Sequence, residues 1–183
     1  MVGVSDTGLD DSSCYFIDTS QKTDIKRSCI NDPYVDFSRR KVVQYSHLKN
    51  ADTEDLTAGH GTHVCGTVAG YNRQPLSGDG KYSGVAPFAK IAFLDIGTAS
   101  GCLYIPPVFE QFSTLRKANA HVCSNSWGGT FSKGRGCYAN ANMDAYLYKN
   151  MDTLILFASG NTGESGLSSM SKEASSKNVV SVG

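Results

Sequence analysis

The feature that most constrains the fold is an alternation of short β-branched runs with longer amphipathic stretches. The runs are bounded by turn residues and occupy 2–4, 41–45, 90–96, 121–124, 153–158 and 179–182. Leu154–Ala158 is apolar at every position, which is typical of a strand covered on both faces in a parallel sheet. Helical patterns at 61–69, 106–118 and 141–149 lie between the runs, so the sequence predicts an α/β layer fold.

Composition limits the classes of protein to which the chain can belong. It has 183 residues, 40% of them hydrophobic, and a formal net charge of zero, which indicates one globular domain. No long basic run is present, so nucleic acid is not an expected partner. The longest apolar run is far shorter than the roughly 20 residues that cross a bilayer, and the chain does not begin like a signal peptide. We therefore expect no membrane segment within it.

The six cysteines fall into two groups according to their neighbours. Cys65 and Cys123 are flanked by valine, as small buried hydrophobic residues are. The other four lie among polar residues: Cys14, Cys29, Cys102 and Cys137. An even set of this kind favours disulfides and an oxidising or secretory compartment, although spacing leaves three connectivities open. Because Cys14 and Cys29 share a polar loop, we predict that they pair, with Cys102 and Cys137 as a second pair.

Two segments carry residues suited to catalysis. In the first, Asp6 follows a buried strand and precedes Thr7 and Gly8, which places a carboxylate at the carboxyl edge of a parallel sheet. By itself the Asp-Thr-Gly triplet is weak evidence for a catalytic residue, because it also resembles the aspartic-protease signature and because many strands end in such a turn. In the second, glycines flank His60 at the expected start of a helix.

Two other interpretations of the histidine segment, a metal site and a phosphate-binding loop, are disfavoured. The spacing of His60, His63 and Cys65 places the first and last on different helix faces, which disfavours a metal site. His63 is better interpreted as a packed or hydrogen-bonded helix residue. The glycine spacing does not match a phosphate-binding loop, which disfavours an α/β cofactor-binding enzyme.

Together the two segments resemble the Asp and His motifs of the subtilases, the subtilisin-like serine proteases. Further segments agree in order: the Gly-Val-Ala-Pro turn at 84–87, Ser-Asn-Ser-Trp-Gly-Gly at 124–129, Ala-Ser-Gly-Asn at 158–161, and the final stretch 171–183. The resemblance covers residues 2–183. It implies an α/β, three-layer subtilisin-like fold with a mostly parallel sheet flanked by helices. It also implies that residues 1–183 form a single, incomplete subtilase catalytic domain whose C-terminal part is missing.

The resemblance also implies a role for each matching residue. His60 would be the general base, Asp6 would orient it, and Asn161 would donate its amide to the oxyanion. Gly101 would pair with an extended peptide substrate. The remaining substrate-binding residues would be Ser126, Trp127, Gly128, Ala158, Ser159 and Gly160.

The family's nucleophile lies in a Gly-Thr-Ser-Met-Ala segment, which is absent from residues 1–183. The expected function is therefore serine endopeptidase chemistry in a longer protein, with truncation as the simplest explanation. The alternative is a catalytically dead, peptide-binding subtilase-like module. No cofactor is firmly expected, and the resemblance assigns no metal ligand. Calcium is the ion that subtilase loops often hold, and Asp10, Asp11 and Asp79 offer oxygen ligands, although solvated loop carboxylates are the favoured explanation of each.

Overall fold

The computed structural model of the chain describes residues 1–21, 23–55, 59–73, 81–129, 137–166 and 169–183. Within them, seven strands form one sheet in the order β2-β3-β4-β1-β5-β6-β7, and every neighbouring pair is parallel. The strands are β1 (Val2–Asp6), β2 (Arg27–Cys29), β3 (Val42–His47), β4 (Ile91–Asp95), β5 (Val122–Asn125), β6 (Leu154–Ala158) and β7 (Val180–Val182).

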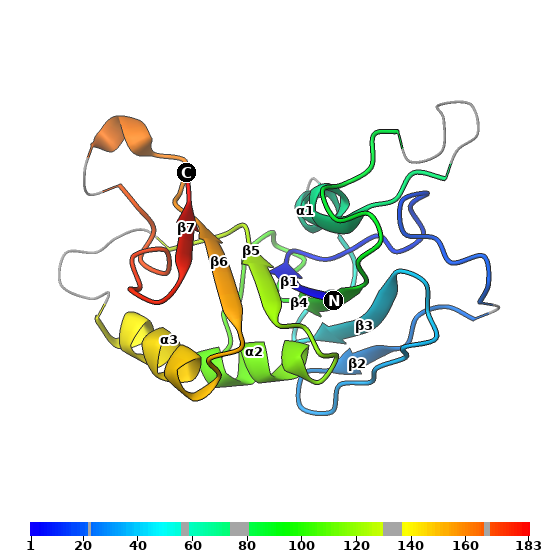
Figure 1. Cartoon of the computed structure of the whole chain (residues 1–183), viewed down its shortest axis with the longest axis horizontal. Coiled ribbons are helices and arrows are strands. Elements are labelled where there is room, and N and C mark those ends of the chain that lie inside the picture. Colours follow the sequence, from blue (N-terminus) through cyan, green and yellow to red (C-terminus); the bar gives the residue numbers. More distant parts are fainter. Residues whose placement is uncertain (22, 56–58, 74–80, 130–136, 167–168) are drawn as a thin grey trace.

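Helices cover both faces of this sheet, as Figure 1 shows. One face carries α1 (His60–Ala69), and the other carries α2 (Val108–Arg116) and α3 (Cys137–Lys149). A short 3-10 helix, η2 (Gly163–Ser165), follows β6. Separate apolar clusters fill the two interfaces, around Phe93 and Cys65 on the α1 side and around Phe112 and Leu94 on the α2 side. The predicted three-layer α/β fold is confirmed.

The strand order determines which residues meet at the carboxyl edge of the sheet. β1 is central, and its last residue, Asp6, lies in register with Asp95 at the end of β4. On its other side β1 pairs with β5, which ends at Asn125, and β5 pairs with β6, which ends at Ala158. Because all these strands are parallel, the predicted catalytic and substrate-binding segments leave the sheet at the same edge.

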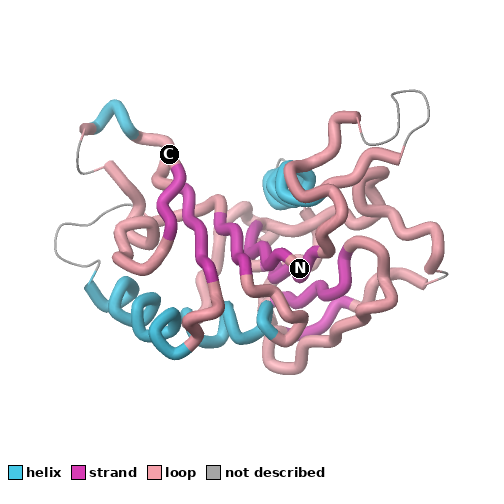
Figure 2. The backbone as a smooth tube through the Cα atoms, viewed as in Figure 1, coloured by secondary structure: helices cyan, strands magenta, loops and turns pink. Residues whose placement is uncertain are grey.

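The predicted strands and helices are found with shifts of a few residues at their ends, and two of the described elements were not predicted, the strand β2 and the short helix η2. The sequence between Asp6 and the predicted strand at 41–45 carries no strand pattern, but Arg27–Cys29 forms the edge strand β2 on β3. Figure 2 shows the residues on either side of β2 as loop. A strand of three residues, two of them polar or charged, carries no periodic pattern, and it forms through its pairing with β3.

The predicted Cys14–Cys29 disulfide is wrong, because both residues are free thiols. The sheet explains their separation. Cys29 packs against the apolar cluster on the α2 side, whereas Tyr15 and Phe16, next to Cys14, pack into the cluster on the α1 side. Cys102 is also a free thiol, and the side chain of Cys137 lies outside the described part of the chain. The free thiols of Cys14, Cys29 and Cys102 therefore give no support to the prediction of an oxidising compartment.

The expected burial of the two valine-flanked cysteines is confirmed. Cys65 and Cys123 have no exposed surface, and each lies within an apolar cluster. Burial raises the pKa of the Cys123 thiol to about 12 and raises that of Cys65 well above its ordinary value. Both side chains therefore act as apolar packing groups rather than as reactive thiols.

Candidate active site

Asp6 and His60 form the centre of the site. His60 Nδ1 lies 2.7 Å from Asp6 Oδ1, and the same oxygen accepts a hydrogen bond from the Thr7 amide at 2.8 Å. The Asp6 side chain is buried, whereas 48% of the His60 side chain is exposed. Since a carboxylate can only accept, the proton of a neutral His60 ring lies on Nδ1, which leaves Nε2 as an acceptor. The pair thus presents a base to solvent at the carboxyl edge of the sheet.

Burial also sets the electrostatics of this pair. Desolvation raises the pKa of Asp6 above its ordinary value, although the hydrogen bonds from His60 and the Thr7 amide oppose the rise. Asp6 Oδ2 is buried and has no hydrogen-bond partner among the described residues. The carboxylate therefore depends on His60 for much of its stabilisation.

The first turn of α1 is fixed by contacts to β1 and to Asp55. The Thr7 hydroxyl donates to Asp55 Oδ1 at 2.9 Å and accepts the amide of Gly61 at 3.0 Å, while Asp55 Oδ2 accepts the Thr62 amide at 2.8 Å. Gly61 permits this approach, because a Cβ there would lie 2.1 Å from the carbonyl oxygen of Gly8. These groups satisfy donors that a helix N-terminus leaves free and hold His60 beside Asp6.

The substrate segment after β5 is anchored through Trp127. Its indole Nε1 donates to the carbonyl oxygen of Ser5 at 2.9 Å, and its ring packs edge-on against Phe157 at a centroid distance of 5.1 Å. Ser126 is half-buried beside it, and Gly128 is exposed. The backbone of this segment is thereby tied to β1, the strand that carries Asp6.

The segment after β6 contains Ala158, Ser159, Gly160 and Asn161, all at least partly exposed. The Ser159 carbonyl oxygen accepts the amide of Ser171 at 2.7 Å, and Ser171 Oγ donates to the Ala158 carbonyl oxygen at 3.1 Å. Asn161 is exposed, and its side-chain amide makes no hydrogen bond to any described residue. It follows the strand end at the same edge as Asp6 and makes no hydrogen bond to Asp6 or His60.

Gly101 lies in a hairpin that follows β4. Gly97 and Leu103 form an antiparallel bridge at its base, and the Gly101 amide donates to the Thr98 carbonyl oxygen at 2.8 Å. Gly101 itself is exposed and has a φ of 78°, a conformation that favours glycine. We call residues 97–103 the edge hairpin.

Some contacts at the site were not predicted from the sequence. Ser171 bridges the two substrate segments, since a Cβ on Gly128 would lie 2.4 Å from the Ser171 Cβ. Glu173 is buried and accepts the amide of Gly129 at 2.8 Å. Thr7 and Asp55 brace α1 as described above. Of these residues, Thr7 could have been identified from the sequence, as a polar residue directly after Asp6. The contacts of Glu173 and Asp55 form only once the chain has folded, and no sequence pattern indicates them.

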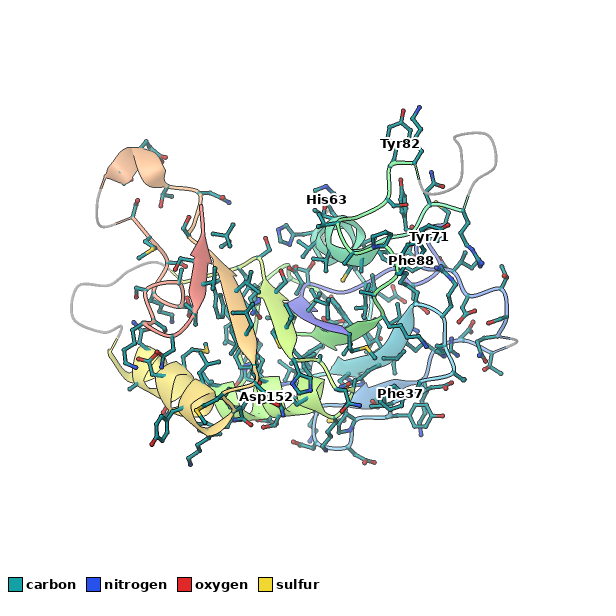
Figure 3. The ribbon with its side chains drawn as sticks, viewed as in Figure 1. Phe37, His63, Tyr71, Tyr82, Phe88 and Asp152 are labelled. Atoms are coloured by element: carbon teal, nitrogen blue, oxygen red, sulfur yellow. The ribbon has the colours of Figure 1, made fainter. Side chains whose placement is uncertain are left out.

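His63 does not occupy the packed position predicted for it. It is exposed and projects from α1 away from the sheet (Figure 3). It lines a cavity of about 680 Å³ that also includes Tyr15, Thr62 and Tyr82. The third residue after His60 lies on the outer side of the helix, while Cys65 lies on its buried side.

The candidate calcium ligands are engaged elsewhere. Asp11 pairs with Arg27 at 2.8 Å, and Asp10 Oδ1 accepts from the Ser12 hydroxyl at 2.6 Å. Asp79 lies outside the described residues. Across the described ranges, no three His, Cys, Asp or Glu side chains gather into a metal-binding group. In the same ranges, no helix has the length and apolar character needed to cross a bilayer.

Comparison with known proteins extends the resemblance seen in the sequence. Three curated relatives from Dictyostelium discoideum match the whole chain: the serine protease/ABC transporter B family proteins tagD and tagB, each 36% identical, and tagA, 30% identical. The chain spans about a tenth of the length of each.

Solved structures share the fold at low sequence identity. The subtilisin-like protease Apa1 of Pseudoalteromonas sp. AS-11 aligns with a TM-score of 0.60 at 21% identity, over 98% of this chain and 35% of Apa1. The prenylagaramide maturation protease PagA aligns with a TM-score of 0.60 at 19% identity, over 100% of this chain and 52% of PagA.

The family model that matches is decisive, because it covers residues 1–183. Its description is the subtilase family, Peptidase_S8. It agrees with the parallel sheet and with the order of the motifs along the chain. The chain belongs to the subtilase family of serine proteases.

Proposed function

We propose that residues 1–183 supply the acid–base and substrate-binding part of a serine endopeptidase site. The observation that carries the proposal is the 2.7 Å contact between His60 Nδ1 and the buried Asp6 carboxylate, with the other side of the ring open to solvent. His60 Nε2 takes the proton of an attacking serine hydroxyl and returns it to the leaving amine. Asp6 holds the tautomer and stabilises the imidazolium.

The substrate is an extended peptide. The exposed edge hairpin with Gly101 pairs with its backbone, and the segments 126–128 and 158–160 bind the residue that precedes the scissile bond. Asn161, whose amide is exposed, donates to the oxyanion that forms as the serine attacks. The nucleophilic serine comes from a segment outside residues 1–183. The segments 97–100 and 168–171 are the nearest approximations of the nucleophile segment within residues 1–183, and their serines Ser100, Ser169 and Ser171 are not assigned this role. Ser100 Oγ bonds to the Thr98 hydroxyl, and Ser171 Oγ donates to the Ala158 carbonyl oxygen.

The test compares residues 1–183 with a longer form of the protein read from its gene through a Gly-Thr-Ser-Met-Ala segment. A fluorophosphonate probe is expected to label the longer form stoichiometrically and the shorter form not at all. In the longer form, His60→Ala is expected to lower kcat/KM for casein by on the order of 10⁶-fold, because the serine loses its base. His63→Ala is the matched control on the same helix, since that ring is exposed, and should retain activity.

Two results contradict the proposal. Labelling of Ser100 or Ser169 in residues 1–183 would show that the nucleophile is misplaced. A longer form that binds peptides but neither labels nor cleaves them would establish the catalytically dead binding module instead.

A further inference from the structure

The strand next to Asp6 ends in a second buried carboxylate. Asp95 has no exposed surface and lies in register with Asp6 on the neighbouring strand. Its Oδ2 accepts the phenol hydroxyl of Tyr45 at 2.8 Å, and its Oδ1 accepts the amide of Gly97 at 2.9 Å. Asp95 belongs to none of the motifs described above, and the catalytic pair does not use it.

These two hydrogen bonds connect β3 to the base of the edge hairpin. Gly97 lies directly against the catalytic strand, because a Cβ there would lie 2.4 Å from the Thr7 carbonyl oxygen. The Ile96 amide donates to the Asp6 carbonyl oxygen at 2.9 Å. The position of Gly97 therefore sets how the exposed part of the hairpin lies relative to Asp6.

We propose that Asp95 is the positioning residue of the edge hairpin: its carboxylate, held by Tyr45, fixes Gly97 against the catalytic strand and so orients the backbone that pairs with substrate. This inference rests on the proposed function for the identity of the ligand. It requires a charged acceptor, because an ionised carboxylate accepts from both donors at once and a protonated one competes with them through its own hydrogen.

The surroundings of Asp95 make its charge responsive to pH. Burial raises its pKa to about 6, although Tyr45, the Gly97 amide and His47 oppose the rise. Asp52 repels the charge, and the Arg27 guanidinium lies over the Tyr45 ring, 4.7 Å from its centroid. The titratable and charged groups facing this carboxylate are Asp6 on β1, Arg27 on β2, Tyr45 and His47 on β3, and Asp52. Above pH 6 the Asp95 carboxylate is ionised and accepts both hydrogen bonds, from Tyr45 and from the Gly97 amide; we call this arrangement the clamp. Below pH 6 the carboxylate is protonated and the clamp weakens.

The test uses residues 1–183 with wild-type, Asp95→Asn, Tyr45→Phe and Asp52→Asn proteins. The amide shift of Gly97 is followed by NMR from pH 4.5 to 8. In the wild type it should titrate with a midpoint near 6; Asp95→Asn should abolish that titration. Tyr45→Phe should move the midpoint upward, since it removes a hydrogen bond that lowers the pKa. Asp52→Asn is the matched control, because it removes a nearby carboxylate that raises the pKa of Asp95: the Gly97 titration should persist, with its midpoint moved below 6.

Two further measurements separate positioning from stability. Hydrogen exchange at Thr98 and Tyr104, whose amides are bonded in the hairpin, should be about tenfold faster in Asp95→Asn at pH 8, with Phe93 unchanged. The tightest binder from a library of acetylated hexapeptide amides should lose about tenfold in affinity between pH 8 and pH 5 with the wild type. Asp95→Asn should show the weaker affinity at both values.

Each outcome decides a separate claim. The positioning role is overturned if Asp95→Asn leaves the Gly97 titration or the hydrogen exchange of the hairpin unchanged. It is also overturned if the peptide affinity of Asp95→Asn depends on pH as that of the wild type does. If Asp95→Asn does not fold, an unmoved midpoint in Tyr45→Phe overturns it equally. If no hexapeptide binds the wild type while the hairpin readouts behave as expected, the clamp stands and the proposed peptide-binding function fails.

Discussion

Replacement of Lys41 by methionine tests how a buried cation supports the helix that carries His60. Lys41 is 1% exposed, and its ammonium donates to the carbonyl oxygens of Ala69, Pro87 and Ala89 at 2.6, 2.7 and 2.9 Å. It thus joins the end of α1 to the turn before β4. Burial, with a smaller contribution from Arg40, lowers its pKa from 10.5 to about 8.

Two opposing energies determine the size of the effect. A hydrogen bond from a charged donor contributes about 1.5–3 kcal/mol, and Lys41→Met leaves three carbonyl oxygens without this donor. The lowered pKa means that burying the charge costs about 3 kcal/mol at pH 7, and methionine removes that cost. We expect Lys41→Met to lower the free energy of unfolding by about 3 kcal/mol at pH 7.

The dependence on pH makes the reasoning refutable. Between pH 8 and 10.5 the folded state releases the Lys41 proton while the unfolded chain keeps it, so rising pH stabilises the wild type. The difference in unfolding free energy between wild type and Lys41→Met should therefore widen to about 6 kcal/mol near pH 10.5. Urea denaturation followed by circular dichroism at pH 7, 9 and 10.5 measures it. Lys90→Met, which removes a single bond to the Phe37 carbonyl oxygen, is the control. A difference that stays constant over this range would refute the account.

Two other predictions concern packing and thiols. Gly61→Ala should lower the free energy of unfolding by more than about 3 kcal/mol, because its Cβ would lie 2.1 Å from the Gly8 carbonyl oxygen, whereas Gly66→Ala on the same helix has space and should be neutral or slightly stabilising in thermal melts. Iodoacetamide should label Cys14 and Cys102 in the folded protein, and mass mapping should find Cys65 and Cys123 modified only after unfolding. Recovery of a Cys14–Cys29 peptide from non-reduced protein would contradict the assignment of free thiols.

The sequence was sufficient for the elements that have a strong pattern. Strands such as β6 carry continuous apolar runs, and the Asp motif and the substrate segments follow such strands, so parallel order alone placed Asp6 and Ala158 at a common edge. The prediction that the strand at 154–158 is covered on both faces was wrong, because Leu154 is exposed and Leu156 and Ala158 are only partly buried. The sequence was insufficient where an element depends on pairing or packing with a distant segment of the chain. β2 exists through its pairing with β3, and the separation of Cys14 from Cys29 follows from the sheet that lies between their neighbours.

The candidate site, too, was predicted from the sequence only in part. The roles given to Asp6 and His60 came from resemblance, and the structure adds their contact of 2.7 Å. The groups that hold the site together were not evident beforehand. Asp95 ends a strand much as Asp6 does, and only its bonds to Tyr45 and Gly97 indicate a role.

The central position of β1 has a consequence for the order of events during synthesis. Val2 lies beside Ile91 on one side and Val122 on the other, so both neighbours of the first strand are made much later than the strand itself. At a synthesis rate of about 5–20 residues per second, the ribosome needs on the order of ten seconds to produce them. Until β4 has been made, the segment with Asp6 has neither of its neighbouring strands to pair with. The residue at the centre of the site is therefore translated well before the strands that hold it, and long-range pairing of this kind slows folding.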